Sequence, residues 1–339
     1  MKNSLKFISI MLILIALTAC SKTDVSTANN VPDQEHHVHN ESTQPEAAAG
    51  TADSDTAAKP DITVDEAKLQ ELLAQFGSET PEKAVTLSVA ITELYDALGL
   101  ELVGVPTTKS QLPEAYANVQ RVGSSHQPDL EQIAKLEPNT VLVPNSIKDS
   151  MQKMFEPSGL PVAFLPVDSL DELKLSTAAL GRLYGKEEQA NQVLTALAEQ
   201  EAAARQSAEG KTAPKVMLLF GSVESLMLMN ENTFAGSLAK NLGAENVLTS
   251  VLKQSETYVP LNMESIIEAN PDVILLIAHG DPAAVAQQFE ADVKKNKAWE
   301  SLTAFKNNKL ITLDYNLYGI SSIVKAPDAY KDLAAILYN

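Results

Sequence analysis

One stretch of the chain occurs twice, first at residues 129–143 and again at 262–276. Each copy opens with a good helix N-cap, Asp129 or Asn262, and has a Glu two residues later, in the first turn. Apolar residues then recur at helical spacing, a Pro follows, and a short apolar strand pattern comes next. A helix-to-strand unit that recurs about 130 residues later predicts two similar α/β lobes, each with a mainly parallel sheet.

The sequence between the two copies predicts a rigid helical connection. Residues 170–208 have a helical pattern that is interrupted near Tyr184-Gly185, and residues 186–208 contain neither Pro nor Gly. A helix over residues 186–208 is about 35 Å long at 1.5 Å per residue. Because a flexible hinge would use Gly and Ser, this connection predicts that the lobes move little relative to each other. A ligand cleft is expected between the lobes.

Composition limits the class of protein. The chain has 339 residues, which is enough for two domains, and 45% of them are apolar. Its net charge of −18 speaks against nucleic acid as a partner, because that binding needs clustered Lys and Arg. The sole cysteine, Cys20, excludes an intrachain disulfide.

The first 19 residues have the pattern of a signal peptide. Lys2 and Lys6 precede an apolar core that is too short for a transmembrane helix. The core ends in Leu17-Thr18-Ala19-Cys20, which resembles the lipobox of bacterial lipoproteins. This resemblance implies cleavage before Cys20 and lipidation of its thiol, so the mature protein would be lipid-anchored at the extracytoplasmic face of the cell membrane.

A polar segment without apolar periodicity follows the Cys and predicts a disordered tether. It contains His36-His37-Val38-His39, which can hold a soft or borderline metal weakly or can be a solvated tract. The spacing of apolar residues from Asp65 to Phe76 predicts a short amphipathic helix.

These patterns predict five parts. They are a lipoprotein signal peptide at 1–19, the lipidated Cys and its tether at 20–80, an N-terminal α/β lobe at 81–168, a helical region at 169–211 and a C-terminal α/β lobe at 212–339.

The predicted lobes contain only two histidines, one in each. His126 lies in a loop marked by Gly and Pro, and His279 lies in a tight loop at the carboxyl end of a predicted strand, where open α/β sheets bind ligands. Facing each other across a cleft, they would supply two axial nitrogen ligands to one iron. The alternative is that each is an ordinary His satisfied by a hydrogen bond.

Patterns of common catalytic sites are missing. The sequence has no Gly-x-Ser-x-Gly elbow, P-loop, Gly-x-Gly-x-x-Gly or His-Glu-x-x-His motif. Two histidines are too few for a zinc or manganese cage built on imidazoles, whereas a hard-cation site made of carboxylates stays open. Glu131 and Glu264, at equivalent positions of the two copies, suit docking on a two-fold partner, or simply complement helix N-termini.

The order and spacing of several segments resemble the substrate-binding lipoproteins of ABC importers, the class with two α/β lobes joined by one backbone helix. The resemblance covers roughly residues 84–339 and is strongest to the haem receptor lipoprotein of the Isd system of Gram-positive bacteria. The segments that carry it are Val122-Gly123 to Pro128, Ser146-Ile147-Lys148-Asp149 with Met151-Gln152, Gly243 to Val247, Asn270-Pro271-Asp272-Val273-Ile274-Leu275, and His279-Gly280 with Pro282.

The resemblance implies a transport function. The chain would take haem from a surface donor protein, bind it between the lobes and deliver it to an ABC permease driven by a cytoplasmic ATPase. It would be a monomer that catalyses no reaction, binds no nucleic acid and contacts the membrane only through its lipid. In the broader class a Glu of each lobe docks on permease arginines, and Glu131 and Glu264 match those positions.

The resemblance also implies the iron ligands. The second-lobe ligand of the family is a His in a Pro-His-Gly context, which His279 matches in Ala-His-Gly. The first-lobe ligand is a Met in a Gly-Gln-Pro-Met context, and His126 stands at that position. This departure predicts ligation by two histidines, which favours ferric haem more than Met/His ligation does.

A bound haem, which the resemblance implies, needs further cleft residues. Donors for the haem propionates and apolar contacts for the porphyrin are expected, and Tyr318 is an alternative iron ligand. The donor candidates are Thr107, Thr108 and Lys109, and the apolar candidates are Leu226, Val259, Tyr318 and Ile320.

Two other functions stay open at this point. A ferric-siderophore or cobalamin receptor of the same fold would leave both histidines incidental and would be expected to have a pocket rich in Trp and Arg, whereas the only Trp here, Trp299, lies in a polar helix context. A haem-dependent redox enzyme would need an open axial position, which two protein ligands would close.

Overall fold

The computed structural model describes residues 64–78, 80–222 and 225–339. The predicted signal peptide, Cys20 and the His36-His37-Val38-His39 tract lie outside these residues. The described part begins with helix α1 (Glu66–Ala74), which Asp65 caps. Helix α1 thus lies inside the segment predicted as a tether, 20–80. Within the described ranges no helix has both the length and the apolar character that crossing a membrane requires.

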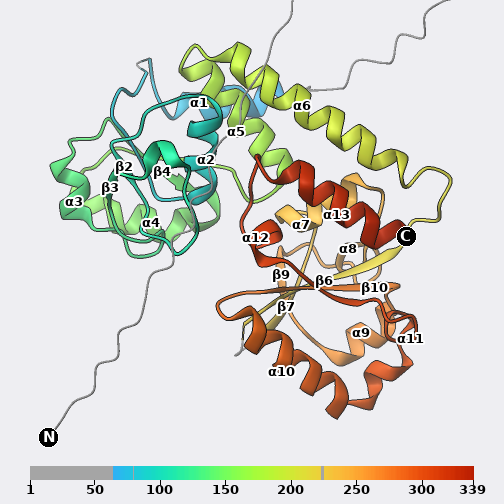
Figure 1. The fold of residues 1–339 in the computed structure, drawn as a ribbon. Coiled ribbons are helices and arrows are strands. Elements are labelled where there is room, and N and C mark those ends of the chain that lie inside the picture. Colours follow the sequence, from blue (N-terminus) through green and yellow to red (C-terminus); the bar gives the residue numbers. More distant parts are fainter. Residues whose placement is uncertain (1–63, 79, 223–224) are drawn as a thin grey trace, which may run out of the picture. The chain divides into compact units, whose positions relative to one another are not determined.

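The first sheet is fully parallel, with strand order β3-β2-β1-β4-β5. Its strands are β1 (Ala84–Thr86), β2 (Gly104–Val105), β3 (Gln120–Arg121), β4 (Thr140–Pro144) and β5 (Val162–Leu165). The helices of this lobe are α2 (Val89–Ala97), α3 (Leu130–Lys135) and α4 (Lys148–Phe155), with 3₁₀ turns at Glu114–Tyr116, Asn145–Ile147 and Glu156–Ser158 (Figure 1).

Two helices connect the sheets in sequence, α5 (Leu170–Leu183) and α6 (Glu187–Gln206). The N-cap of α5 is a capping box, in which Ser169 and Glu172 satisfy each other's backbone N–H groups. The break between the helices falls at Tyr184-Gly185, as the sequence predicts, and Gly185 supplies the required positive φ of 63°. The backbone helix α6 has 20 residues.

The second sheet is mixed, with strand order β11-β10-β6-β7-β9 and β8 paired to β6. Strands β6, β8, β10 and β11 pair in parallel, whereas β7 and β9 are antiparallel. The strands are β6 (Lys215–Gly221), β7 (Leu226–Met229), β8 (Glu245–Asn246), β9 (Tyr258–Pro260), β10 (Val273–Ala278) and β11 (Leu310–Leu313). The helices are α7 (Phe234–Asn241), α8 (Val247–Ser250), α9 (Met263–Ala269), α10 (Pro282–Lys295), α11 (Thr303–Lys306), α12 (Tyr315–Tyr318) and α13 (Ala326–Tyr338), with a 3₁₀ turn at Lys297–Ser301. The predicted fold class is confirmed.

The sequence repeat is also a repeat of hydrogen bonds. After the Pro of each copy stands an Asx residue, Asn139 or Asp272, whose side chain accepts a 2.8 Å hydrogen bond from the backbone N–H of Lys83 or Lys215. The N–H of each Asx donates back to the carbonyl of the same Lys at 2.8 Å. In both copies the residue before the Pro has a positive φ, 49° or 37°. The unit therefore ties the start of β4 to the start of β1, and the start of β10 to the start of β6.

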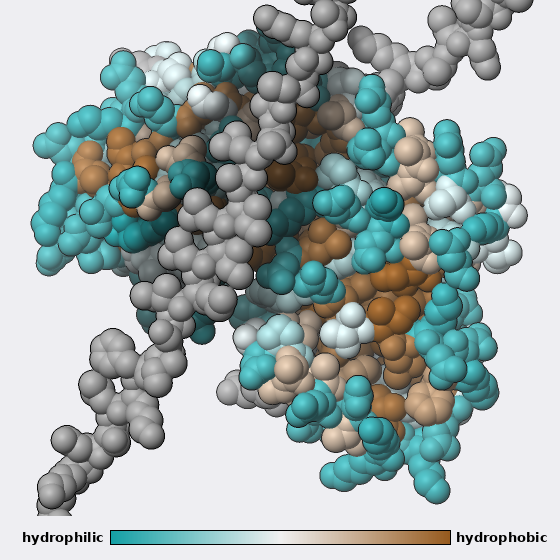
Figure 2. All heavy atoms as spheres, in the orientation of Figure 1, coloured by the Kyte–Doolittle hydropathy of each residue, from teal (hydrophilic) through white to brown (hydrophobic). Residues whose placement is uncertain are grey.

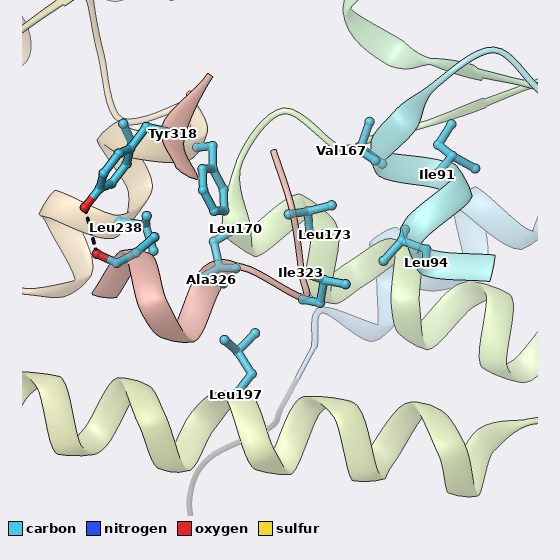
Figure 3. Packing of buried hydrophobic residues seen from close by; sticks show 14 of the residues in the cluster. Ile91, Leu94, Val167, Leu170, Leu173, Leu197, Leu238, Tyr318, Ile323 and Ala326 are labelled. Carbon is cyan, nitrogen blue, oxygen red and sulfur yellow. Dashed lines mark hydrogen bonds between the residues drawn. The ribbon is translucent and has the colours of Figure 1, made fainter. Parts of the chain in front are cut away.

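The largest hydrophobic cluster contains residues of both lobes and of the helices that connect them. Leu94 of α2, Leu173 of α5, Leu197 of α6 and Leu238 of α7 are buried in it, and Figure 3 shows these side chains around one interior. In the face shown in Figure 2, hydrophilic residues dominate the outer edge and apolar residues gather toward the middle. A continuous core across the helical region supports the prediction that the lobes move little.

A buried carboxylate on α6 ties this helix to its neighbours. The Glu201 side chain is 8% exposed and lies 2.7 Å from Lys174 Nζ of α5, and it also pairs with Arg205 one turn later. Tyr330 of α13 lies against the same carboxylate, and burial, together with this negative charge, raises the pKa of Tyr330. Asn241 of α7 donates to Tyr330 Oη at 3.0 Å. Four helices meet at one ion pair.

Replacing Glu201 by Ala is expected to destabilise the protein by about 2 kcal/mol. Losing one partner of a fully buried pair costs more, but Lys174 and Arg205 reach solvent with 22% and 54% of their side chains and can be rehydrated. Urea denaturation measures the change. The control is Glu199→Ala on the exposed side of the same helix, expected within about 0.5 kcal/mol of the parent. Equal effects of the two variants would contradict the prediction.

Candidate functional site

A cleft of about 730 Å³ is lined by residues of both sheets and of the helices that follow them. Pro144 of β4, Phe220 of β6 and Ile277 of β10 bring strand ends to it. The first residues of α2 and α7 form other parts of its wall. The volume lies within the range of small-molecule sites, and the position is the one that open α/β sheets use for ligands. Another cavity of about 550 Å³, beside α1 and α5, contains none of the predicted site residues.

His126 lies at the tip of a tight turn in the wall of this cleft. Ser124 and Gln127 exchange two backbone hydrogen bonds, of 3.0 and 3.2 Å, which leaves Ser125 and His126 as the two residues of the turn. The Ser125 hydroxyl donates to the carbonyl of Leu87, just beyond β1. The side chain of His126 is exposed. A rigid turn thus presents an accessible imidazole to the cleft.

Gly123 closes the base of this turn. Its φ is +87°, and a Cβ at this position would lie 2.5 Å from Gln127 O and 2.6 Å from the backbone nitrogen of Asp129. Asp129 in turn caps α3, because its side chain accepts from Gln132 N at 3.0 Å. Glu131 lies in the first turn of that helix. The turn of His126 and the helix of Glu131 are therefore one continuous segment.

His279 is held from the other lobe by a strand end. Its backbone N–H donates to Gly221 O at 2.7 Å, which extends the β10–β6 ladder by one residue. Gly280, with a φ of +86°, turns the chain, and Asp281 then caps α10. The backbone of His279 is fixed by the sheet, and its side chain is exposed in the cleft.

The ring of His279 has two aromatic neighbours. Tyr315 Oη lies 2.8 Å from His279 Nδ1, and the Phe220 ring lies 5.5 Å away at an interplanar angle of 31°. Burial raises the pKa of Tyr315, so its phenol stays protonated at neutral pH. His279 Nε2 makes no hydrogen bond to any residue that the structure describes. Nε2 is therefore the ring nitrogen available to a ligand.

The predicted donor loop reaches the cleft in part. Thr108 and Lys109 line it together with Ser110, whose N–H donates to Thr108 Oγ1 at 3.0 Å. Thr107 is not among the lining residues; its N–H donates to Gly123 O at 2.8 Å and ties the loop to the turn of His126.

The predicted apolar residues divide into two groups. Tyr318 and Ile320 line the cleft. Leu226 of β7 and Val259 of β9 do not, because their side chains pack against the core of the second sheet. Tyr258, one residue before Val259, lines the cleft instead.

The hydroxyl of Tyr318 is already engaged inside the protein. It lies 2.8 Å from Asp332 Oδ2. It also donates to Ala329 O at 3.0 Å, and Figure 3 shows a hydrogen bond of this hydroxyl as a dashed line. Burial, with the hydrogen bond to Asp332, raises the pKa of Tyr318 far above its ordinary value. A phenolate is therefore costly to form at this position, which makes Tyr318 a poor alternative iron ligand.

Other residues of the cleft were not predicted from the sequence, namely Phe220, Tyr258, Tyr315 and Asp168. Phe220 lies near the end of β6, and Tyr315 follows β11 by two residues. A systematic search of residues at the carboxyl ends of parallel strands would have found both. Asp168 follows β5, accepts from Ser146 Oγ at 2.9 Å, and has its pKa raised by burial.

The electrostatics of the cleft favour an anionic ligand at two helix ends. Ser88 and Thr233 cap α2 and α7, and the first residues of both helices line the cleft. Helix N-termini present backbone N–H groups and a partial positive charge. Among the described lining residues, Lys109 and Asp168 are the charged ones. Asp168 therefore opposes an anion that the helix ends and Lys109 attract.

Glu131 and Glu264 lie outside the cleft lining, in the first turns of α3 and α9. Both side chains are exposed. Each is the second residue of its helix, after the N-cap Asp129 or Asn262, so they occupy the equivalent positions that the sequence repeat predicts.

Known proteins resemble this chain over most of its length. The family model of the periplasmic binding proteins matches residues 85–317. The high-affinity heme uptake system protein IsdE of Staphylococcus aureus is 32% identical over 257 residues, 76% of this chain and 87% of that protein. The crystal structure of IsdE complexed with heme has a TM-score of 0.70 at 31% identity and covers 76% of this chain and 99% of its own.

Two other solved structures share this fold. An ABC transporter substrate-binding protein from Listeria monocytogenes has a TM-score of 0.70 at 35% identity, covering 76% of this chain and 98% of its own. Staphylococcus aureus SirA complexed with staphyloferrin B has a TM-score of 0.64 at 22% identity, covering 77% and 94%. The likeness to SirA concerns the fold alone.

Proposed function

The chain belongs to the periplasmic binding protein family, and from this premise we propose that it binds haem in the cleft and delivers it to an ABC permease. The family is one of substrate-binding proteins for transport. The observation that carries the proposal is that His126 of one lobe and His279 of the other line the same cleft. Two opposed imidazoles suit the two axial positions of a haem iron.

The remaining cleft fits the parts of haem. Phe220 and Ile320 offer aromatic and apolar contacts to a porphyrin. The N-terminus of α2, together with Thr108 and Lys109, offers donors and positive charge to propionates. Haem binds through His126 and through His279 Nε2. Compared with Met/His ligation, this pair favours the ferric state.

The same proposal covers the partners. Lipidation of Cys20 anchors the protein at the extracytoplasmic face of the membrane. The protein is a monomer there, and a surface donor protein supplies its haem. Glu131 and Glu264 dock on basic sockets of the permease, since each carries an exposed carboxylate at the start of an equivalent helix.

Titration of the purified protein with haemin tests the function. Uptake of one equivalent with the absorption and EPR spectra of low-spin, bis-nitrogen ferric haem is the expected result. Parallel titrations with ferric siderophores and cobalamin, followed by quenching of Trp299 fluorescence, provide the comparison. No uptake of haemin, with tight binding of a siderophore or cobalamin, would replace the haem proposal with the other receptor function.

Asp168→Asn is expected to raise haem affinity about threefold to fivefold at neutral pH. Removing one negative charge about 4 Å from a carboxylate in water is worth about 1 kcal/mol. Burial raises the pKa of Asp168, and Glu172 and Tyr258 are its titratable neighbours. Affinity of the parent should therefore rise as the pH falls through this raised value, since protonation removes the repulsion, and the variant should lack this increase.

The carboxyl group of Asp168 also makes the stability of the folded protein depend on pH. Because its pKa is higher in the folded than in the unfolded protein, its contribution to stability is complete below the ordinary Asp value and is lost as pH rises through the raised value.

The control for the affinity prediction is Asp171→Asn, which changes an exposed neighbour outside this cleft. A variant of Asp168 with the parent's affinity and pH profile would exclude this repulsion.

A further inference from the structure

The contact between Tyr315 and His279 follows from strand register. Strands β10 and β11 pair in parallel with Ile277 opposite Leu313. His279 and Tyr315 each stand two residues beyond this pair, so the two chains leave the sheet side by side. Their rings lie 5.6 Å apart, and Tyr315 Oη lies 2.8 Å from His279 Nδ1. The hydrogen bond is thus built into the sheet.

The position of the Tyr315 ring is fixed from its other side. Asp314 caps α12 by accepting from Asn316 N at 2.9 Å, and Tyr315 O accepts from Gly319 N at 2.8 Å. A Cβ on Gly319 would lie 2.3 Å from two ring carbons of Tyr315. The absence of a side chain at Gly319 therefore provides the space in which this ring lies.

We propose that Tyr315 is a positioning residue that sets the tautomer and orientation of His279 for iron. Its hydroxyl oxygen accepts a hydrogen bond from Nδ1–H, which leaves the lone pair of Nε2 directed at the ligand. The phenol then increases the basicity of the imidazole, and this stabilises ferric haem over ferrous haem. The inference rests on the proposed haem function, but its first part concerns the haem-free protein.

The cleft contains a matched control for this role. Tyr258 also lines it and contacts Phe220, with ring centroids 6.1 Å apart. No hydrogen bond joins Tyr258 to His279 among the described residues. Tyr258→Phe removes a cleft hydroxyl without touching the imidazole, whereas Tyr315→Phe removes the hydroxyl that bonds Nδ1.

The tautomer of His279 in the haem-free protein is the first measurement. Long-range ¹H–¹⁵N correlation spectra at about pH 8.5, two units above the ordinary His value, report the neutral ring. The expected result is Nδ1–H in the parent and in Tyr258→Phe, and Nε2–H, the form preferred by free imidazole side chains, in Tyr315→Phe. Nε2–H in the parent, or no change in Tyr315→Phe, would overturn the inference. Neither outcome depends on haem binding.

The haem-loaded protein gives the second measurement. Tyr315→Phe should keep a low-spin spectrum and lose about tenfold in ferric affinity relative to ferrous affinity. This ratio corresponds to a rise of 59 mV in the one-electron potential. Gly319→Ala, which displaces the ring without deleting the hydroxyl, should shift the potential in the same direction, and Tyr258→Phe should not. An unchanged potential, or loss of the axial spectrum in Tyr315→Phe because the phenolate itself is the ligand, would contradict the assignment.

Discussion

Replacing His279 by Ala is expected to lower the affinity for ferric haem by more than about 100-fold. Loss of a residue that merely supports a metal ligand costs about 10–100-fold, and loss of the ligand itself costs more. The same change at His126 is expected to have a similar effect, since both imidazoles line the cleft and each is an iron ligand under the proposed ligation. Haemin titrations with EPR spectra of both variants provide the measurement.

His126→Met is the informative control for this pair. It introduces the thioether that the resemblance to the Isd haem receptors implies at this position, so haem should remain bound in a low-spin form. The reduction potential should rise by on the order of 100 mV, a fraction of the about 0.8 V that axial ligands span. If only His279 proves necessary for binding, the receptor function stands and His126 is removed from the ligand set.

Gly123→Ala is expected to cost about 3–4 kcal/mol of stability and about tenfold in haem affinity. A left-handed φ of +87° is unfavourable for Ala, and the added Cβ would also collide with Gln127 O and Asp129 N. Both contacts are backbone atoms, so the collision cannot be relieved by a rotamer change. The turn that presents His126 must open.

Gly159→Ala separates the cost of the left-handed φ from the cost of the collision between the added Cβ and the backbone. Gly159 has a similar φ of +66°, but a Cβ there meets no atom within 4 Å. This variant should lose only the conformational cost, about 1–2 kcal/mol, and should keep the haem affinity of the parent. Thermal and urea unfolding, with haemin titrations, measure both quantities. Equal losses in the two variants would refute the role assigned to the closed turn.

The elements that sequence predicts well are those specified locally. The interruption at Tyr184-Gly185 and the helix that follows need only Gly chemistry and a run without Gly or Pro, and the structure has both. The repeat is equally local, because each N-cap and each Pro lie within one short segment. Two similar lobes could therefore be predicted before any contact between them was known.

The sequence prediction and the structure differ where the packed face of a strand decides the outcome. Leu226 and Val259 are predicted in the cleft, but in β7 and β9 their side chains pack against the core of the second sheet. An alternating pattern does not say which face of a strand is buried. The contact of Tyr315 with His279 is not predicted from the sequence for a related reason. The two residues are 36 positions apart, and only the register of β10 and β11 brings them together.

The continuity between the turn of His126 and α3 has a consequence for unloading. Five positions separate His126 in the cleft from Glu131 on the outer surface, and the intervening chain is closed by Gly123 and capped by Asp129. Under the proposed function, a permease that binds Glu131 would therefore contact the far end of the segment that carries one iron ligand. A small displacement of this segment would weaken one axial bond, while His279, fixed to its sheet, would keep the other. Haem would then leave in two steps, without wide separation of lobes that share one core.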